Sequence, residues 1–268
     1  MSKMTDREFL ATDQYEDASK FSARVQFHAR FGTNPYSWFL WVFDHLNLPP
    51  CCRILELGCG PASLWCENMH RISPGWLLAL SDVSAGMLKQ ARKNLSSSTH
   101  SFAYATADAQ AIPFADGSFD GAIANQVLYH VSDRSRALCE IVRVIRPAGS
   151  FYASTVGQSH LHELADLLHR FDPGLTFFWG DSLVSTFTLE TGYGELSQWF
   201  SHVSLARYED KLVVTESEPL VAFVLASLSS EISRKRQQAL IQFVEKELES
   251  YGAIQVTRDI GLFEAISS

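Results

Sequence analysis

Glycines and acidic residues stand where three apolar runs of the sequence end. In the stretch ILELGCGPASLW (54–65), an apolar run ends beside the acid Glu56, and Gly58 and Gly60 follow it. Asp82 ends the run GWLLALSD, and Asp108 ends HSFAYATAD. If these runs are neighbouring parallel strands, their carboxyl ends meet at one edge of a sheet, where such folds bind ligands. The three positions therefore predict a single ligand site, and the glycines allow close approach to the backbone.

The turn after the first strand is poorly suited to phosphate. A dinucleotide fingerprint requires a further glycine where this chain has Ser63. Pro61 also lacks the backbone N–H that a pyrophosphate at a helix N-terminus would use. The turn therefore argues against a nicotinamide dinucleotide.

The two strand-end acids suit a nucleoside. A carboxylate at Asp82 can accept hydrogen bonds from both hydroxyls of a ribose. A carboxylate at Asp108 can accept from an exocyclic amine, while the backbone N–H of Ala109 donates to a ring nitrogen. Together these positions predict a site for adenosine.

Strands and helices alternate over residues 53–155, which predicts a doubly wound, mostly parallel α/β sheet. Ser84 is a candidate N-cap for the helix SAGMLKQARKNL, and Pro147 is expected to stop the helix DRSRALCEIVRVIRP. The expected strands are 53–57, 75–82, 100–108, 119–125 and 149–155.

The chain is expected to have four parts. Residues 1–46 are predicted to form an N-terminal helical cap with a break at Asn34-Pro35, and 47–155 the ligand-binding core. Residues 156–185 interrupt the alternation, so we interpret them as a lid inserted over the site. Residues 186–268 should complete the sheet, with helices near 217–229 and 231–251 and a last strand in GLFEAISS.

Composition restricts the classes of partner. The chain has 268 residues, 46% of them hydrophobic, enough for one core or for a core with a small cap. The net charge of −8 disfavours nucleic acid. The apolar runs are far shorter than the ~20 residues of a membrane span, and no targeting segment is expected. The scattered cysteines form neither a disulfide framework nor a zinc spacing, which favours a reducing cytoplasm.

Four stretches resemble the class I S-adenosylmethionine-dependent methyltransferases: LELGCGPAS, LSDVSAGMLKQAR, ADAQAIPFADGSFDGAIANQVLYHV and IVRVIRPAGSFY. The resemblance is strongest to the small-molecule branch that includes the ubiquinone and menaquinone biosynthesis methyltransferases. It implies a Rossmann-like sheet, S-adenosylmethionine as cofactor, S-adenosylhomocysteine as product, and 47–155 as the domain that binds them. One departure is Ala62, because the family motif usually has a third glycine there.

The resemblance also implies roles for individual residues. The glycine-rich motif should lie beside the methionine part of the cofactor, Asp82 at the ribose and Asp108 at the adenine. Tyr15, in the N-terminal segment, would close over the sulfonium. The cofactor-binding set expected in this way is Tyr15, Glu56, Gly58, Cys59, Gly60, Asp82, Val83, Met87, Asp108, Ala109, Asn125 and Gln126.

Methyl transfer requires alignment, exclusion of water and, for some nucleophiles, removal of a proton. His130 follows the fourth strand, and the ordinary titration range of histidine suits a base at neutral pH, so it is the candidate catalytic residue. Alternatively, it orients the loop or packs on substrate. His162, Asp166 and His169 could share a helix face, but no further ligand set is visible and no metal is expected.

Aromatic residues indicate the acceptor class. Trp38 in YSWFLWVF, and Phe178 and Trp179 in FFWG, are candidate substrate contacts, although both stretches could instead fill a core. They favour a small apolar or aromatic acceptor, such as an indole, a polyketide or a prenylated quinone. O-, N- and C-methylation stay open, as does the oligomeric state. The alternative functions are a non-catalytic S-adenosylmethionine-binding protein and a nicotinamide-dependent oxidoreductase.

Overall fold

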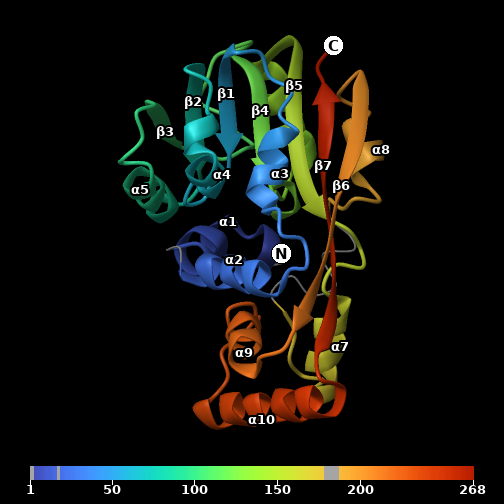
Figure 1. Cartoon of the computed structure of the whole chain (residues 1–268). Helices are drawn as coiled ribbons and strands as arrows, with labels where there is room; N and C mark the ends of the chain where they lie inside the picture. Colours follow the sequence, from blue (N-terminus) through green and yellow to red (C-terminus); the bar gives the residue numbers. More distant parts are fainter. Residues whose placement is uncertain (1–2, 17–18, 178–186) are drawn as a thin grey trace.

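One sheet of seven strands runs through the part of the chain that the computed structural model describes, residues 3–16, 19–177 and 187–268 (Figure 1). The strand order is β3-β2-β1-β4-β5-β7-β6; β1 to β5 are parallel, and β7 is antiparallel to β5 and β6. The predicted doubly wound, mostly parallel Rossmann-like sheet is confirmed. The strands are β1 Cys51–Leu57, β2 Gly75–Asp82, β3 Phe102–Thr106, β4 Phe119–Asn125, β5 Ile145–Val156, β6 His202–Val214 and β7 Ile254–Ile266.

Helices cover both faces of the parallel strands. Successive side chains of a strand point to opposite faces, so Ile54 enters one hydrophobic core and Leu55 the other. The core around Ile54 contains α3 (Trp38–Asp44), α4 (Ser63–Glu67) and α5 (Ala85–Asn94). The core around Leu55 contains α6 (Arg134–Val144) and α8 (Gly192–Leu196).

The predicted start of α5 is confirmed, whereas the predicted end of α6 is wrong. Ser84 caps α5 as predicted, because its Oγ accepts the backbone N–H of Met87 at 3.1 Å. The expectation that Pro147 stops α6 is wrong: α6 ends at Val144, and Pro147 lies in β5. The register between β4 and β5 shifts near that point, and such an irregularity tolerates a residue without a backbone N–H.

The antiparallel pair β6–β7 extends past the parallel strands and packs against a second group of helices (Figure 1). These are α7 (His162–Phe171), α9 (Ser217–Leu225) and α10 (Arg234–Tyr251), of which α9 and α10 connect β6 to β7. They share a third core with α2 (Ser19–Phe31) and with Leu212 and Val256 of the strand pair. The last strand is therefore much longer than GLFEAISS, because its first half packs against helices that sequence periodicity does not connect to it.

The N-terminal helices lie between the two halves of the molecule. α1 (Arg7–Phe9) and α2 lie below the parallel strands, and α2 contacts both β6 and α9 (Figure 1). The chain breaks between α2 and α3, as Asn34-Pro35 predicts. Within 156–185, α7 belongs to the third core, and the interpretation of this segment as a lid stays a prediction. Among the described residues, none of the helices combines the length and apolarity needed to cross a membrane.

The third core generates the first testable prediction. Leu164 of α7 is fully buried in it. We expect Leu164→Ala to lower the free energy of unfolding by about 2–5 kcal/mol, because a buried leucine leaves a cavity. Urea unfolding measures this. Leu77→Ala is the control, because Leu77 is 61% exposed and should change stability by less than about 0.5 kcal/mol. Equal stabilities for the two variants would contradict the assignment of α7 to a core.

Candidate functional site

The turn between β1 and α4 opens on a cavity of about 550 Å³. Gly58 and Gly60 have φ values of 65° and 54°, in the left-handed region that favours glycine. A Cβ on Gly58 would lie 2.5 Å from a methyl group of Val127, whereas a Cβ on Gly60 would meet nothing within 4 Å. The backbone at Gly60 is therefore open to a ligand.

Ala62 holds a left-handed conformation without being glycine. Its φ is 64°, which costs an L-residue roughly 1–2 kcal/mol. Its side chain is fully buried, and burying one methyl group offsets about 0.8 kcal/mol of that cost. The turn therefore keeps its shape although the third glycine of the family motif is missing.

Asp82 connects the first two strand ends. Its Oδ2 accepts the backbone N–H of Gly60 at 2.9 Å, and its Oδ1 accepts that of Ser84 at 2.8 Å. Burial raises the pKa of this carboxyl, and the backbone hydrogen bonds oppose the rise. Each carboxylate oxygen can accept a second hydrogen bond, so Asp82 can bind a pair of hydroxyls at the cavity wall.

Asp108 lies in a smaller hollow of about 80 Å³ next to the main cavity. Its Oδ1 accepts the backbone N–H of Gln110 at 2.9 Å, and its Oδ2 lies 3.4 Å from the guanidinium of the exposed Arg7. Ala109 lines the same hollow. The two hollows share the wall residues Leu10, Gly58, Val83, Val127 and His130. The predicted ribose and adenine positions thus lie in adjoining spaces.

The main cavity brings together most of the residues predicted from the sequence. The predicted residues that line it are Tyr15, Trp38, Glu56, Gly58, Cys59, Gly60, Asp82, Val83, Met87, Asn125, Gln126 and His130. Phe178 and Trp179 lie outside the described residues. The separate sequence positions therefore converge on one space, while the roles assigned to them stay predictions.

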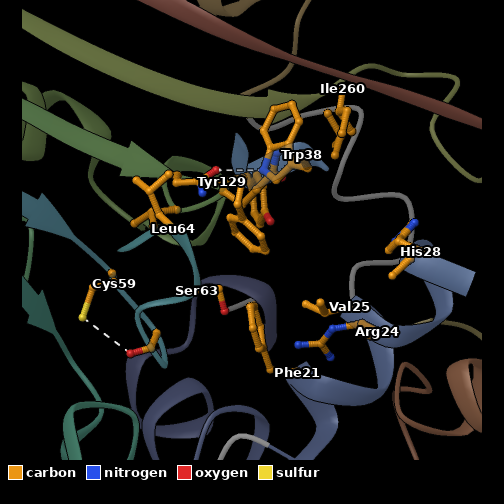
Figure 2. Close-up of a pocket in the computed structure, with 18 of the residues that line it drawn as sticks. Phe21, Arg24, Val25, His28, Trp38, Cys59, Ser63, Leu64, Tyr129 and Ile260 are labelled. Carbon is orange, nitrogen blue, oxygen red and sulfur yellow. Dashed lines mark hydrogen bonds between the residues drawn. The ribbon is translucent and has the colours of Figure 1, made fainter. Parts of the chain in front are cut away.

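The end of β4 holds an aromatic ring against the cavity. Asn125 Oδ1 accepts hydrogen bonds from Trp38 Nε1 at 3.3 Å and from Ser154 Oγ at 2.5 Å. Ser154 Oγ in turn accepts the backbone N–H of Gln126, whose φ of 61° is unusual for a non-glycine residue. Strained backbone of this kind gathers at functional sites. Figure 2 shows Trp38 at the cavity wall.

His130 joins the N-terminal segment to the loop that follows β4. Its Nδ1 lies 2.9 Å from the carbonyl oxygen of Met4, and its Nε2 lies 3.1 Å from the hydroxyl of Tyr15. A carbonyl only accepts, so Nδ1 carries the proton and Nε2 accepts from Tyr15. Burial lowers the pKa of His130 to about 4. The ring is therefore neutral at physiological pH and has both nitrogens engaged.

Glu56 and Cys59 are both buried beside the turn. Trp65 Nε1 donates to Glu56 Oε2 at 2.5 Å, while burial raises the pKa of Glu56 to about 8. Burial also raises the pKa of the Cys59 thiol well above its usual range. A protonated thiol is a poor nucleophile, so Cys59 has the environment of a packing residue.

Sequence reasoning missed the opposite wall of the cavity. Figure 2 shows Phe21, Arg24, Val25 and His28 of α2 across from Ser63 and Leu64 of α4. His160, Tyr208, Phe223 and Arg258 also line the cavity. No local motif connects these residues and those of α2, because together they come from five separate elements or loops of the chain.

Comparison with known proteins shows which family the parallel part of the chain resembles. Residues 55–153 match the model of the methyltransferase domain family. Over 124 residues the chain is 33% identical to a malonyl-[acyl-carrier protein] O-methyltransferase of Erwinia pyrifoliae, covering 46% of this chain and 45% of that protein. It is 32% identical over 99 residues to a ubiquinone/menaquinone biosynthesis C-methyltransferase of Pectobacterium carotovorum, covering 36% and 39%. The chain thus spans less than half the length of these relatives.

Residues 55–153 form a class I S-adenosylmethionine-dependent methyltransferase domain.

Solved structures share the fold around this methyltransferase domain. The phosphoethanolamine N-methyltransferase 2 of Haemonchus contortus, solved in complex with S-adenosyl-L-methionine, gives a TM-score of 0.59 at 17% identity. That match covers 97% of this chain and 59% of the other. The YcgJ protein of Bacillus subtilis gives 0.56 at 15% identity, covering 85% and 97%.

The buried acid of the methyltransferase domain generates the second prediction. The folded-state pKa of Glu56 is about 8, above the 4.5 of the free side chain. Between these values the folded protein keeps a proton that the unfolded chain loses, so stability falls as pH rises. Glu56→Gln removes this loss and keeps an acceptor for Trp65. We expect its stability relative to the wild type to rise from pH 5 to pH 8, by on the order of several kcal/mol, and then to level off.

Urea unfolding without ligand at a series of pH values measures this difference. Glu249→Gln is the matched control, because Glu249 is exposed on α10 and should follow the wild type. Parallel stability curves for Glu56→Gln and the wild type would contradict the burial of a proton at Glu56.

Proposed function

We propose that this protein transfers a methyl group from S-adenosylmethionine to a small acceptor with an apolar or aromatic body. The observation that carries the proposal is that one cavity joins the open turn at Gly60 and the carboxylate of Asp82 to an aromatic wall of Phe21, Trp38 and Phe223. Its volume of about 550 Å³ lies within the range of ligand pockets, ~300–1,000 Å³.

The binding roles follow from the strand ends. Asp82 would accept from the ribose hydroxyls, and Asp108 with the N–H of Ala109 would hold the adenine. The turn at Gly58 and Gly60 would lie against the methionine part, next to Glu56. Two observations support the fit of the cofactor to these residues. The space beside Gly60 is unobstructed, and the carboxylate oxygens of Asp82 can accept further hydrogen bonds.

The bound cofactor supplies a methyl group on a sulfonium, which is already activated for displacement by a nucleophile. The chain must then align the acceptor and exclude water. Tyr15 supports such a role, because its backbone oxygen accepts from Ser84 Oγ at 2.7 Å and its hydroxyl reaches His130. These bonds hold the N-terminal segment over the turn, where it shields the reacting centre.

His130 was the candidate base, and we propose the alternative positioning role for it. Both of its ring nitrogens are engaged, and its pKa of about 4 makes it a weak base. It would hold Met4 and Tyr15 in the closed arrangement. The acceptor then either needs no proton removed or loses it to another group.

The finer description of the substrate is also a proposal. An indole, a polyketide or a prenylated quinone would suit the aromatic wall, in a cytoplasmic pathway of specialised metabolism. A second candidate function is a non-catalytic S-adenosylmethionine-binding protein, which would use the same residues. Incubation with radiolabelled S-adenosylmethionine and a small-metabolite extract separates the two, because only the enzyme transfers label into a metabolite. The oxidoreductase is disfavoured by Pro61 and Ser63.

The third prediction tests the ribose ligand. We expect Asp82→Asn to weaken S-adenosylhomocysteine binding by about ten- to a hundredfold, because a hydrogen bond to a charged group contributes ~1.5–3 kcal/mol. Calorimetry measures this, with the exposed Asp166→Asn as a control that keeps wild-type affinity. A 2′-deoxyribose analogue separates the ribose contact from a distorted turn: the wild type should discriminate against it, and the variant should not. Equal discrimination by both proteins would remove Asp82 from the ribose site.

The fourth prediction separates the two roles of His130. Glutamine can donate to Met4 and accept from Tyr15, but it cannot act as a base. If His130 positions the cap, we expect His130→Gln to raise the KM for S-adenosylmethionine and to lower kcat by less than about tenfold. Steady-state kinetics on the acceptor from the extract measure both. A loss of about 10²–10⁴ in kcat at saturating cofactor would instead establish a general base.

A further inference from the structure

Basic side chains line the end of the cavity that lies away from the carboxyl ends of the parallel strands. His28 comes from α2, His160 follows β5, and Arg258 comes from β7. Arg24 of α2 also lines the cavity, with its guanidinium 5.4 Å from the ring centroid of Tyr15. The imidazoles of His28 and His160 lie nearly parallel, with ring centroids 6.1 Å apart and an interplanar angle of 24°. The carboxylates that line the cavity are Glu56, Glu67 and Asp82, from β1, α4 and β2. The two ends of the cavity therefore differ in their chemistry.

Three polar atoms of this basic end have no hydrogen-bond partner among the described residues. They are Nδ1 of His28, Nδ1 of His160 and Nε of Arg258, and all three are buried. A buried polar atom left unpaired costs about 1–3 kcal/mol. Native proteins keep few such atoms, and three in one cluster at a cavity wall are typical of groups that serve a ligand.

Arg258 is held rigidly at this wall. Its Nη1 donates to Oδ2 of Asp210, whose side chain is fully buried, at 2.6 Å, and its guanidinium lies 5.1 Å from the ring centroid of Tyr208. Asp210 Oδ1 in turn accepts the backbone N–H groups of Thr33 and Asn34, each at 2.8 Å. Asp210 does not itself line the cavity. Asp210 thus holds the guanidinium of Arg258 through Nη1, while Nε is a buried donor without a partner.

Burial keeps both imidazoles neutral at physiological pH. It lowers the pKa of His160 to about 3 and that of His28 well below its usual range. The positive charge of Arg258 lowers both pKa values further. An anion beside these rings would oppose that effect and would accept their N–H groups. The electrostatics of the cluster therefore favour a negatively charged ligand over a cation.

We propose that the acceptor carries an oxyanion, a carboxylate or a phosphate group, which His28, His160 and Arg258 bind at the basic end of the cavity. This inference rests on the proposed function in taking the ligand to be the methyl acceptor. Apolar side chains line the wall beside the cluster, including Phe21, Val25 and Phe223. They would cover the apolar body of a molecule whose anionic group is anchored at the histidines.

Calorimetric titration of three probes into the full chain tests the proposal. The probes are 3-phenylpropionate, 2-phenylethyl phosphate and the neutral 3-phenylpropionamide, each titrated with and without saturating S-adenosylhomocysteine. We expect at least one of the two acids to bind about ten- to a hundredfold more tightly than the amide, as charged hydrogen bonds predict. The tighter of the two acids identifies carboxylate or phosphate. An amide that binds as tightly as both acids, or no binding of any probe in the millimolar range, would overturn the proposal.

His160→Leu shows whether the cluster is the site. The change removes an unpartnered buried nitrogen, so the melting temperature should stay the same or rise, while acid binding weakens about tenfold or more. His28→Leu is a second variant with the same expectation, and His169→Gln on the exposed face of α7 is the control that keeps both properties. A His160→Leu protein with wild-type affinity for the acids would overturn the assignment.

A failure of the oxyanion-site proposal can be told apart from a failure of the proposed methyltransferase function. S-adenosylhomocysteine affinity is measured in the same preparations. Intact cofactor binding without preference for acids removes only this inference. Preference for acids without cofactor binding removes the methyltransferase assignment and leaves the oxyanion site.

Discussion

The carboxylate of Asp82 is the constraint on which the arrangement of the site depends. It accepts the backbone N–H of Gly60 from one strand-to-helix turn and that of Ser84 from the next. Ser84 then uses its hydroxyl in two ways, capping α5 at Met87 and donating to the carbonyl of Tyr15. A single buried acid therefore links the β1–α4 turn, the start of α5 and the N-terminal segment.

The N-terminal segment depends on a second, independent connection. His130 accepts from Tyr15 and donates to Met4, so the segment is fixed at both of its ends. Gly86 shows how closely the two layers meet, because a Cβ there would lie 1.9 Å from the carbonyl oxygen of Glu16. The N-terminal segment and the start of α5 thus meet through a backbone contact at Gly86 that admits no larger side chain.

The two ends of the cavity carry different titratable groups, acids near the ends of the parallel strands and histidines at the other end. Burial raises the pKa values of Glu56 and Asp82 and lowers those of His28 and His160. Desolvation disfavours the charged form of each group, so a ligand of the complementary sign would stabilise that form at either end. A cofactor with a cationic centre and an acceptor with an anionic group would satisfy both ends of one space.

The sequence by itself determined the parallel strands and predicted many of the residues that line the cavity. Gly60, Asp82 and Asp108 could be found because each ends or closely follows a local apolar run, and the topology of parallel strands brings such ends to one edge. The basic cluster had no comparable signal. His28, His160 and Arg258 are far apart in the chain and belong to a helix, a loop and a strand with no shared periodicity. Only the tertiary structure decided their meeting, because the long antiparallel pair β6–β7 and α2 both border the cavity. Hydrophobic burial drives that packing, and it is non-directional, so local pattern does not encode which polar residues it brings together.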